Sequence, residues 1–396
     1  MAVRGNLHRS GDREDRRVTN IELFFDLVYV FAVTQLSHYL LAELTVTGAL
    51  QALLLLTMVW LVWAYTSWVT NWLDPDRTPV RLMLVALMLG SLVLSAGLPH
   101  AFTDRGLWIG GSYAAMQIGR SGFAVAGLAG HPLQRNFQRI LSWCLVSGLL
   151  AVLGGLVHGD ARAGCWAAAV AIDLLGGTVG FYTPGLGRSS TADWTISGHH
   201  IAERCQAFML IALGESVVVI GSRVAGLSSL TGAEIGAFGT AFLGVVALWW
   251  VYFDRSAEAS AAVIARSADP GRLGRSAYHF IHPVMVAGII VIAAADERVL
   301  TDPTAGTTGP TAWLVLGGTA LFLAGHAAFK LTVWQLLPAS RLAAVVLLAL
   351  LGIVATSVRT LVLGALAAAV VIGVAVVDRL TAVPDEEAVA ELPADA

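Results

Sequence analysis

Charged residues are scarce in this chain of 396 residues: Asp, Glu, Lys and Arg supply 13% of it, while hydrophobic residues supply 57%. Soluble domains average about 25% charged residues, so the composition excludes an ordinary soluble globular protein. The three cysteines lie far apart without metal-ligand spacing, which supports neither a disulfide framework nor a thiolate metal site. The net charge of −3 does not indicate any class of partner, but no segment resembles a basic nucleic-acid patch, so we expect no nucleic acid as a partner.

The sequence also lacks the short motifs of the common catalytic sites. It contains no nucleotide-binding loop, no HExxH helix and no nucleophile elbow. We therefore predict no cofactor and assign no catalytic residue, while metal binding stays open.

Long apolar runs are abundant, and the mean hydropathy is +0.73. A helix needs roughly 17–25 predominantly apolar residues to cross a bilayer. The runs predict an all-α, polytopic transmembrane helix bundle of about twelve spans. The predicted spans cover residues 23–41, 47–70, 80–98, 106–128, 138–157, 164–182, 203–221, 234–253, 279–297, 312–333, 341–357 and 359–379.

The distribution of Lys and Arg predicts the orientation, because cytoplasmic loops of membrane proteins retain positive charge. An even number of spans puts both termini on one side, and that side holds 18 of the 24 basic residues against five on the other. We predict a multi-pass protein of the bacterial inner membrane with both termini in the cytoplasm. Residues 1–20 would form a cytoplasmic segment, and the acidic residues 381–396 a disordered cytoplasmic tail.

A weak internal repeat relates the two parts of the predicted transmembrane domain, residues 21–380. VTGA at 46–49 aligns with LTGA at 230–233, and GGS at 110–112 aligns with GGT at 317–319. Six spans per half would make the halves, 21–185 and 199–380, parallel repeats. The alternative is a shared composition of helix starts and small residues.

Two carboxylates stand at the start of the first span. Glu22 and Asp26 are one helical turn apart, and Tyr29 continues their face. A charged side chain at the centre of a membrane helix costs about 2.5–3.5 kcal/mol, so such pairs usually have a role. We expect one at the cytoplasmic mouth of the bundle.

The span at 106–128 carries a second polar stripe, which includes Gln117 and Arg120. A buried arginine needs a carboxylate or a cavity. Glu22, Asp26 or Asp254 could supply the counter-charge for Arg120.

The segment HHIAERCQAFMLIALGES at 199–216 holds a further concentration of polar residues. Glu203 lies at its inner boundary, and Glu215 lies twelve residues further along, about 18 Å deeper. Glu215 is thus the most embedded carboxylate, with Ser216 beside it. Asp173 in the span at 164–182 is the only comparable one.

Histidines complete the candidate set. His279 and His282 are one turn apart, and His326 lies in the span at 312–333. Metal binding, structural roles and proton transfer all stay open for them. By depth alone, we expect a group of polar residues near the mouth formed by Glu22 and Asp26, namely Arg120, His200, Glu203, Asp254, His279, His282 and His326.

Three blocks of this sequence resemble the bacterial low temperature requirement protein A family, and the similarity extends over residues 20–380. The blocks are IELFFDLVYVFAVTQLSHYL at 21–40, TSWVTNWLDPD at 66–76 and HHIAERCQAFMLIALGES at 199–216. The resemblance implies an integral membrane protein and specifies no substrate. The residues of this sequence that match the motifs of the family are Glu22, Phe25, Asp26, Asn71, Asp74, His200, Glu203, Arg204, Gly214, Glu215 and Ser216.

Three functions compete. The first is a proton- or ion-coupled, transporter-like protein that moves an unknown small molecule or ion through a site of carboxylates, Arg and His. The second is a membrane-embedded enzyme with a cytoplasm-facing Glu/Asp/His/Arg site, and the third is a structural or cold-adaptation protein whose charges fix helix register. The missing catalytic motifs lower the second. The lipid bilayer is the expected surroundings, and homo-oligomerisation stays open.

Overall fold

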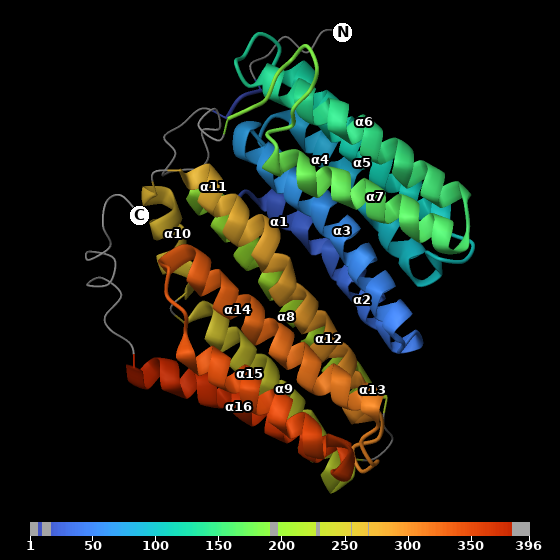
Figure 1. The fold of residues 1–396 in the computed structure, drawn as a ribbon, viewed down its shortest axis with the longest axis vertical. Coiled ribbons are helices and arrows are strands. Elements are labelled where there is room, and N and C mark those ends of the chain that lie inside the picture. Colours follow the sequence, from blue (N-terminus) through green and yellow to red (C-terminus); the bar gives the residue numbers. More distant parts are fainter. Residues whose placement is uncertain are drawn as a thin grey trace. The chain divides into compact units, whose positions relative to one another are not determined.

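The computed structural model describes residues 7–9, 17–190, 197–226, 230–254, 256–267 and 269–381 (Figure 1). Within these ranges the chain forms helices and no β-strand, which confirms the predicted all-α class. The helices are α1 Asn20–Leu27, α2 Tyr29–Ala42, α3 Val46–Trp72, α4 Thr78–Gly97, α5 Gly106–Gly127, α6 Gln134–Leu156, α7 Gly159–Thr178, α8 Gly198–Ala225, α9 Gly232–Phe253, α10 Ser256–Arg266, α11 Pro270–Gly274, α12 His282–Thr301, α13 Gly309–Ala312, α14 Gly318–Trp334, α15 Ala339–Val354 and α16 Thr360–Thr381. The predicted tail lies beyond Thr381, outside the described residues.

Ten helical segments of the described chain are long and apolar enough to cross a membrane, which confirms the polytopic class. α1 with α2 forms the first of them, and α11 with α12 forms one of 31 residues. α5 and α7 coincide with predicted spans but are not among the ten. The total of twelve spans therefore stays a prediction.

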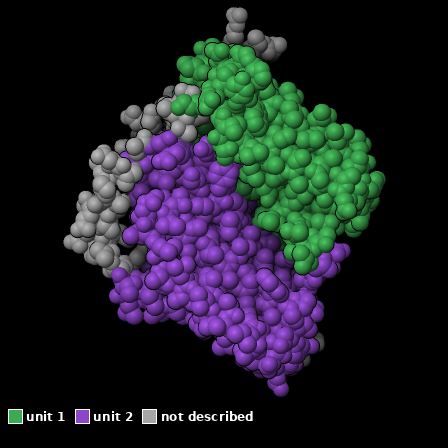
Figure 2. All heavy atoms as spheres, in the orientation of Figure 1, with its two compact units in different colours: residues 1–39, 46–204 green, residues 40–45, 205–396 purple. Residues whose placement is uncertain are grey.

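The chain divides into two compact units, coloured separately in Figure 2. Unit 1 comprises Met1–Tyr39 and Val46–Arg204, and unit 2 comprises Leu40–Thr45 and Cys205–Ala396. The chain passes from one unit to the other within α8. The predicted repeat of two halves stays a prediction.

Glycines allow the helices of unit 1 to pack closely. A Cβ atom on Gly110 of α5 would lie 2.0 Å from the carbonyl oxygen of Ala151 in α6. On α6, a Cβ on Gly155 would lie 2.9 Å from the carbonyl oxygen of Gly106. Small residues let membrane helices approach at backbone distance, where dispersion contacts hold them together. α4, α5, α6 and α7 accordingly pack side by side in sequence order (Figure 1).

The same device joins α12 and α14 in unit 2. A Cβ on Gly288 would lie 2.6 Å from the backbone nitrogen of Phe322, and one on Gly318 would lie 3.0 Å from that of Ile292. Two π-helical turns, Arg275–Ile281 before α12 and Trp313–Gly317 before α14, lengthen these helices. Single π-helical turns are uncommon and often occur at functional sites.

Candidate functional site

Glu22 and Asp26 of α1 share one arginine from α8. Arg204 donates to Asp26 from Nε (2.8 Å to Oδ2) and Nη2 (2.6 Å to Oδ1), a two-bond fork. Its Nη1 donates to Glu22 Oε1 at 3.1 Å and to the Thr70 hydroxyl of α3 at 3.2 Å. Trp63 Nε1 adds a third bond to Asp26, at 2.6 Å. Bidentate, charge-assisted bonds of this kind are the strongest that side chains make.

His200 binds Glu22 from the first turn of α8, with 2.8 Å between His200 Nε2 and Glu22 Oε1. The backbone N–H of Ser197 donates to Asn71 Oδ1 at 3.1 Å, which leaves Asn71 Nδ2 facing His200 Nδ1 at 3.3 Å. An amide nitrogen only donates, so Nδ1 of His200 accepts. The neutral imidazole then carries its proton on Nε2, and this N–H donates a hydrogen bond to Glu22.

The start of α1 explains why Glu22 is held so firmly. Both the backbone N–H and the hydroxyl of Thr19 donate to Glu22 Oε2, at 3.0 and 2.9 Å. This is the reach of a capping-box glutamate back to the first residue of its helix. Arg9 Nη1 lies 3.8 Å from the same oxygen. Glu22 thus serves both as a helix cap and as the link between α1 and α8.

An open cleft of about 660 Å³ lies beside this network in unit 1. Thr19, which binds Glu22, lines it. Its charged lining residues are Asp76 and Arg81, joined at 2.7 Å. The cleft is lined by Val18, Thr19, Asn20, Ile21, Phe24, Asp76 and Arg81. Thr19 therefore contacts both Glu22 and the cleft.

A second buried network in unit 1 surrounds Asp173 of α7. Tyr113 of α5 donates its hydroxyl to Asp173 Oδ2, and Gln117 Nε2 donates to the same oxygen at 2.9 Å. The Gln117 side-chain oxygen accepts from Arg120 Nη2. Gln117 therefore bridges a buried carboxylate and a buried guanidinium that make no direct ion pair.

The prediction that Glu22 or Asp26 neutralises Arg120 is wrong. Both carboxylates bind Arg204, and among the described residues no carboxylate oxygen lies within 4.0 Å of the Arg120 guanidinium. Arg120 instead lies 5.1 Å from the centre of the Tyr65 ring and donates weakly, at 3.4 Å, to the Thr66 hydroxyl. Its Nε has no hydrogen-bond partner in the described chain.

The other predicted residues of unit 1 lie around the first network. The Tyr29 hydroxyl accepts from Ser91 of α4 at 2.9 Å, and its ring lies 5.3 Å from that of Phe25. Glu203 is partly exposed and accepts from the Val18 backbone N–H at 3.1 Å.

The predicted histidines of unit 2 gather around Tyr252 of α9. Its ring centre lies 5.8 Å from His282 and 6.5 Å from His326. Nδ1 of His326 also accepts from Arg341 Nε at 3.4 Å, and Arg341 forms a fork with Asp378. His279 is buried one turn before His282.

Glu215, Ser216 and Asp254 complete the predicted set in unit 2. Glu215 and Ser216 are buried, as expected of a deep position. The Ser216 hydroxyl has no hydrogen-bond partner among the described residues. Asp254 lies 3.7 Å from Arg379, so it pairs with a residue of α16.

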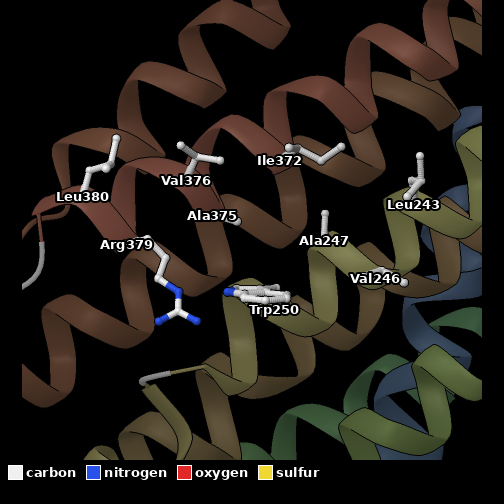
Figure 3. Close-up of a pocket in the computed structure, with 9 residues that line it drawn as sticks. All are labelled: Leu243, Val246, Ala247, Trp250, Ile372, Ala375, Val376, Arg379 and Leu380. Carbon is white, nitrogen blue, oxygen red and sulfur yellow. The ribbon is translucent and has the colours of Figure 1, made fainter.

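An open apolar groove lies between α9 and α16, shown in Figure 3. Arg379 lines it, 5.5 Å from the centre of the Trp250 ring. The rest of the groove is lined by aliphatic side chains. None of the predicted site residues lines it.

Sequence reasoning missed the residues of α3 that take part in these networks, since Trp63 donates to Asp26 and the hydroxyls of Thr66 and Thr70 accept from arginines. Trp63, Thr66 and Thr70 recur at helical spacing along α3, and this polar face inside an apolar run was the signal that could have found them. Within the described ranges, no group of three or more His, Cys, Asp or Glu side chains is arranged to hold a metal.

The apolar helices and the polar networks buried among them define a multi-pass membrane protein. Residues 17–376 match the family of the bacterial low temperature requirement A protein, and the chain belongs to that family. It is 34% identical over 348 residues to an uncharacterized protein of Rhizobium meliloti (strain 1021), covering 86% of this chain and 83% of that one. No solved structure matches the chain.

Proposed function

We propose that this protein is a proton- or ion-coupled, transporter-like protein of the bacterial inner membrane. The observation that carries the proposal is the buried network in which Glu22 and Asp26 share Arg204 beside a cleft. Ionisable residues inside membrane spans are costly, and they commonly mark ion pathways and proton relays. The excess of Lys and Arg supports an orientation with both termini, and hence the cleft, on the cytoplasmic side.

The geometry suggests how a proton would act on this network. Two carboxylates compete for one guanidinium, so protonation of either one weakens its bond to Arg204 and leaves the other carboxylate with the full charge. The bonds between α1 and α8 would then change. A ligand shifts such an equilibrium only through its different affinity for the two arrangements. Of these two carboxylates, Glu22 is the closer to the cleft, because Thr19 both binds Glu22 and lines the cleft.

A structural role is the second candidate, favoured by how completely the network is paired. Every guanidinium nitrogen of Arg204 donates a hydrogen bond. Such a network could also have the purely structural role of fixing the register of α1, α3 and α8. Buried ion pairs are weak evidence for stability but can specify one arrangement over others.

Proton flux into proteoliposomes tests the proposal. Vesicles with an internal pH-sensitive dye receive an imposed pH gradient, with Na⁺, K⁺ or choline as the external cation. The proposal expects dye quenching that requires the protein and that Glu22→Gln abolishes, because Glu22 belongs to the network that carries the proposal. Glu43→Gln, at an exposed position, is the matched control and should leave the flux unchanged.

Gel filtration and circular dichroism show whether each variant folds. Flux equal to that of protein-free vesicles under every cation would contradict transport. If Glu22→Gln, Asp26→Asn and Glu215→Gln changed only thermal stability, the structural role would replace it.

A further inference from the structure

Asp296 lies in α12, inside a predicted span, and its carboxylate makes no ion pair among the described residues. Its Oδ2 is buried without a hydrogen-bond partner among the described residues. No Lys, Arg or His nitrogen of the described chain lies within 4.0 Å of it. Elsewhere in the described spans, Glu22, Asp26 and Asp173 all bind polar side chains. Asp296 thus differs from these buried carboxylates.

A small cavity of about 40 Å³ lies beside Asp296. Two hydroxyl residues, Thr240 of α9 and Thr319 of α14, line it together with the carboxylate. The other lining residues carry no titratable or charged group; they are Ala241, Gly244, Leu248, Ile292, Ala295, Val299, Val315, Gly364, Ala367, Ala368 and Val371. About 10–15 Å³ suffices for one water-sized occupant.

The cavity lies about one to two helical turns from the nearest ends of α12 and α9. Asp296 is five residues from the end of α12 at Thr301, or about 8 Å. Thr240 is eight residues from the start of α9 at Gly232, or about 12 Å. The π-helical turn Trp313–Gly317 contributes Val315 to the wall, and such turns recur at functional sites.

A carboxyl group in such surroundings either holds its proton or, when ionised, requires a bound cation, because an unpaired desolvated charge is unfavourable. Ca²⁺ needs six to eight oxygen ligands, and Mg²⁺ needs an octahedral set. The lining side chains offer one carboxylate and two hydroxyls. Because the carboxylate supplies one negative charge, a monovalent cation matches this set.

We propose that the Asp296 cavity binds one exchangeable monovalent cation, Na⁺ or H⁺. This inference rests on the proposed function in one respect, since it adds a second binding site for a coupled ion. Thr240 and Thr319 would position the cation against the carboxylate. The site is separate from the Glu22 network, which lies wholly in unit 1.

Dicyclohexylcarbodiimide, which modifies protonated carboxyl groups in apolar surroundings, is the probe. Purified full-length protein in detergent is treated across a pH series, in NaCl or in choline chloride, and mass spectrometry quantifies modification of Asp296. A proton site predicts modification that rises as the pH falls, equally in both salts. A Na⁺ site predicts, in addition, protection by NaCl at constant pH.

Variants separate the site from general effects of salt. Asp296→Asn should abolish the modification, while Glu297→Gln should preserve it. For a Na⁺ site, Thr319→Val should raise the NaCl concentration for half-protection about tenfold, which corresponds to 1.4 kcal/mol. Thr304→Val, at an exposed position, should not change it.

Absence of modification at Asp296 at every pH in choline chloride, with the wild-type protein melting at the same temperature in both salts, would overturn the proposal. Loss of fold in a variant is scored separately by gel filtration. Because binding is measured without a gradient, failure of transport leaves this result intact. Proton flux that persists when Asp296 binds nothing would overturn this inference alone.

Discussion

A double-mutant cycle on Asp26 and Arg204 gives the most quantitative test of the buried network. Asp26→Asn removes the charge opposite Arg204 and turns one acceptor oxygen into a donor. That new N–H faces donors on every side, since Arg204 and Trp63 supply all three bonds to Asp26. Breaking a buried pair from one side costs about 3–5 kcal/mol, and we expect this loss in the free energy of unfolding.

The control substitution removes one bond and no charge. Trp63→Phe deletes the 2.6 Å bond to Asp26 Oδ1 but leaves the fork from Arg204. A hydrogen bond to a charged group contributes about 1.5–3 kcal/mol, so the loss should be smaller than for Asp26→Asn.

Removing both partners should recover much of the cost. Asp26→Leu with Arg204→Met leaves neither charge of that fork unpaired, and Glu22 keeps its bonds to His200 and Thr19. The single variants of this cycle are Asp26→Leu and Arg204→Met. We expect the free energy of unfolding of the double variant to fall by about 3 kcal/mol less than the sum of the two single losses, which is the upper range for residues in direct contact. Titration with sodium dodecyl sulfate in mixed micelles, followed by tryptophan fluorescence, measures each value. Additive losses, or single losses below about 1 kcal/mol, would refute the assignment of Arg204.

Two further predictions concern packing and the histidine. Gly110→Ala should destabilise the protein by about 1–3 kcal/mol, because its methyl group would lie 2.0 Å from the Ala151 oxygen; Gly111→Ala, with open space around its Cβ, should be neutral in the same titration. Asn71→Asp turns the donor opposite His200 Nδ1 into an acceptor, which favours the imidazolium. Nitrogen NMR should then show both ring nitrogens protonated at neutral pH, and a ring that stays neutral would contradict the assigned tautomer.

The positions of the helices could be predicted from the sequence better than which helices pack against one another. Apolar runs alone located the ten helical segments of the described chain that are long enough to cross a membrane, because the bilayer sets their length. Within the first span the helix is interrupted at Val28, between α1 and α2, although the apolar pattern is continuous there. Local composition therefore identifies the span and misses this interruption.

The partners of the carboxylates could not be predicted from depth. Arg120 and Arg204 both lie in predicted or motif positions near the same end, and the sequence favoured Arg120. Which arginine faces Asp26 depends on which helices are adjacent and how each is rotated, and spacing along one helix fixes neither. Arg204 was visible only as a residue of the third block shared with the family.

Asp296 was overlooked for a related reason. It is followed directly by Glu297 and Arg298, a charged run typical of the end of a span. The structure continues α12 to Thr301, which places the carboxylate inside the helix.

The flux of Glu22→Gln proteoliposomes, normalised to reconstituted protein, tests the central claim most directly. Gln keeps one acceptor oxygen, which can serve either Thr19 or His200, since these bind different oxygens of Glu22. It cannot take up a proton at neutral pH. We expect this variant to fold and insert, with lower thermal stability, but to lose the proton flux seen in the wild type and in Glu43→Gln. Unchanged flux in a folded Glu22→Gln variant would contradict it.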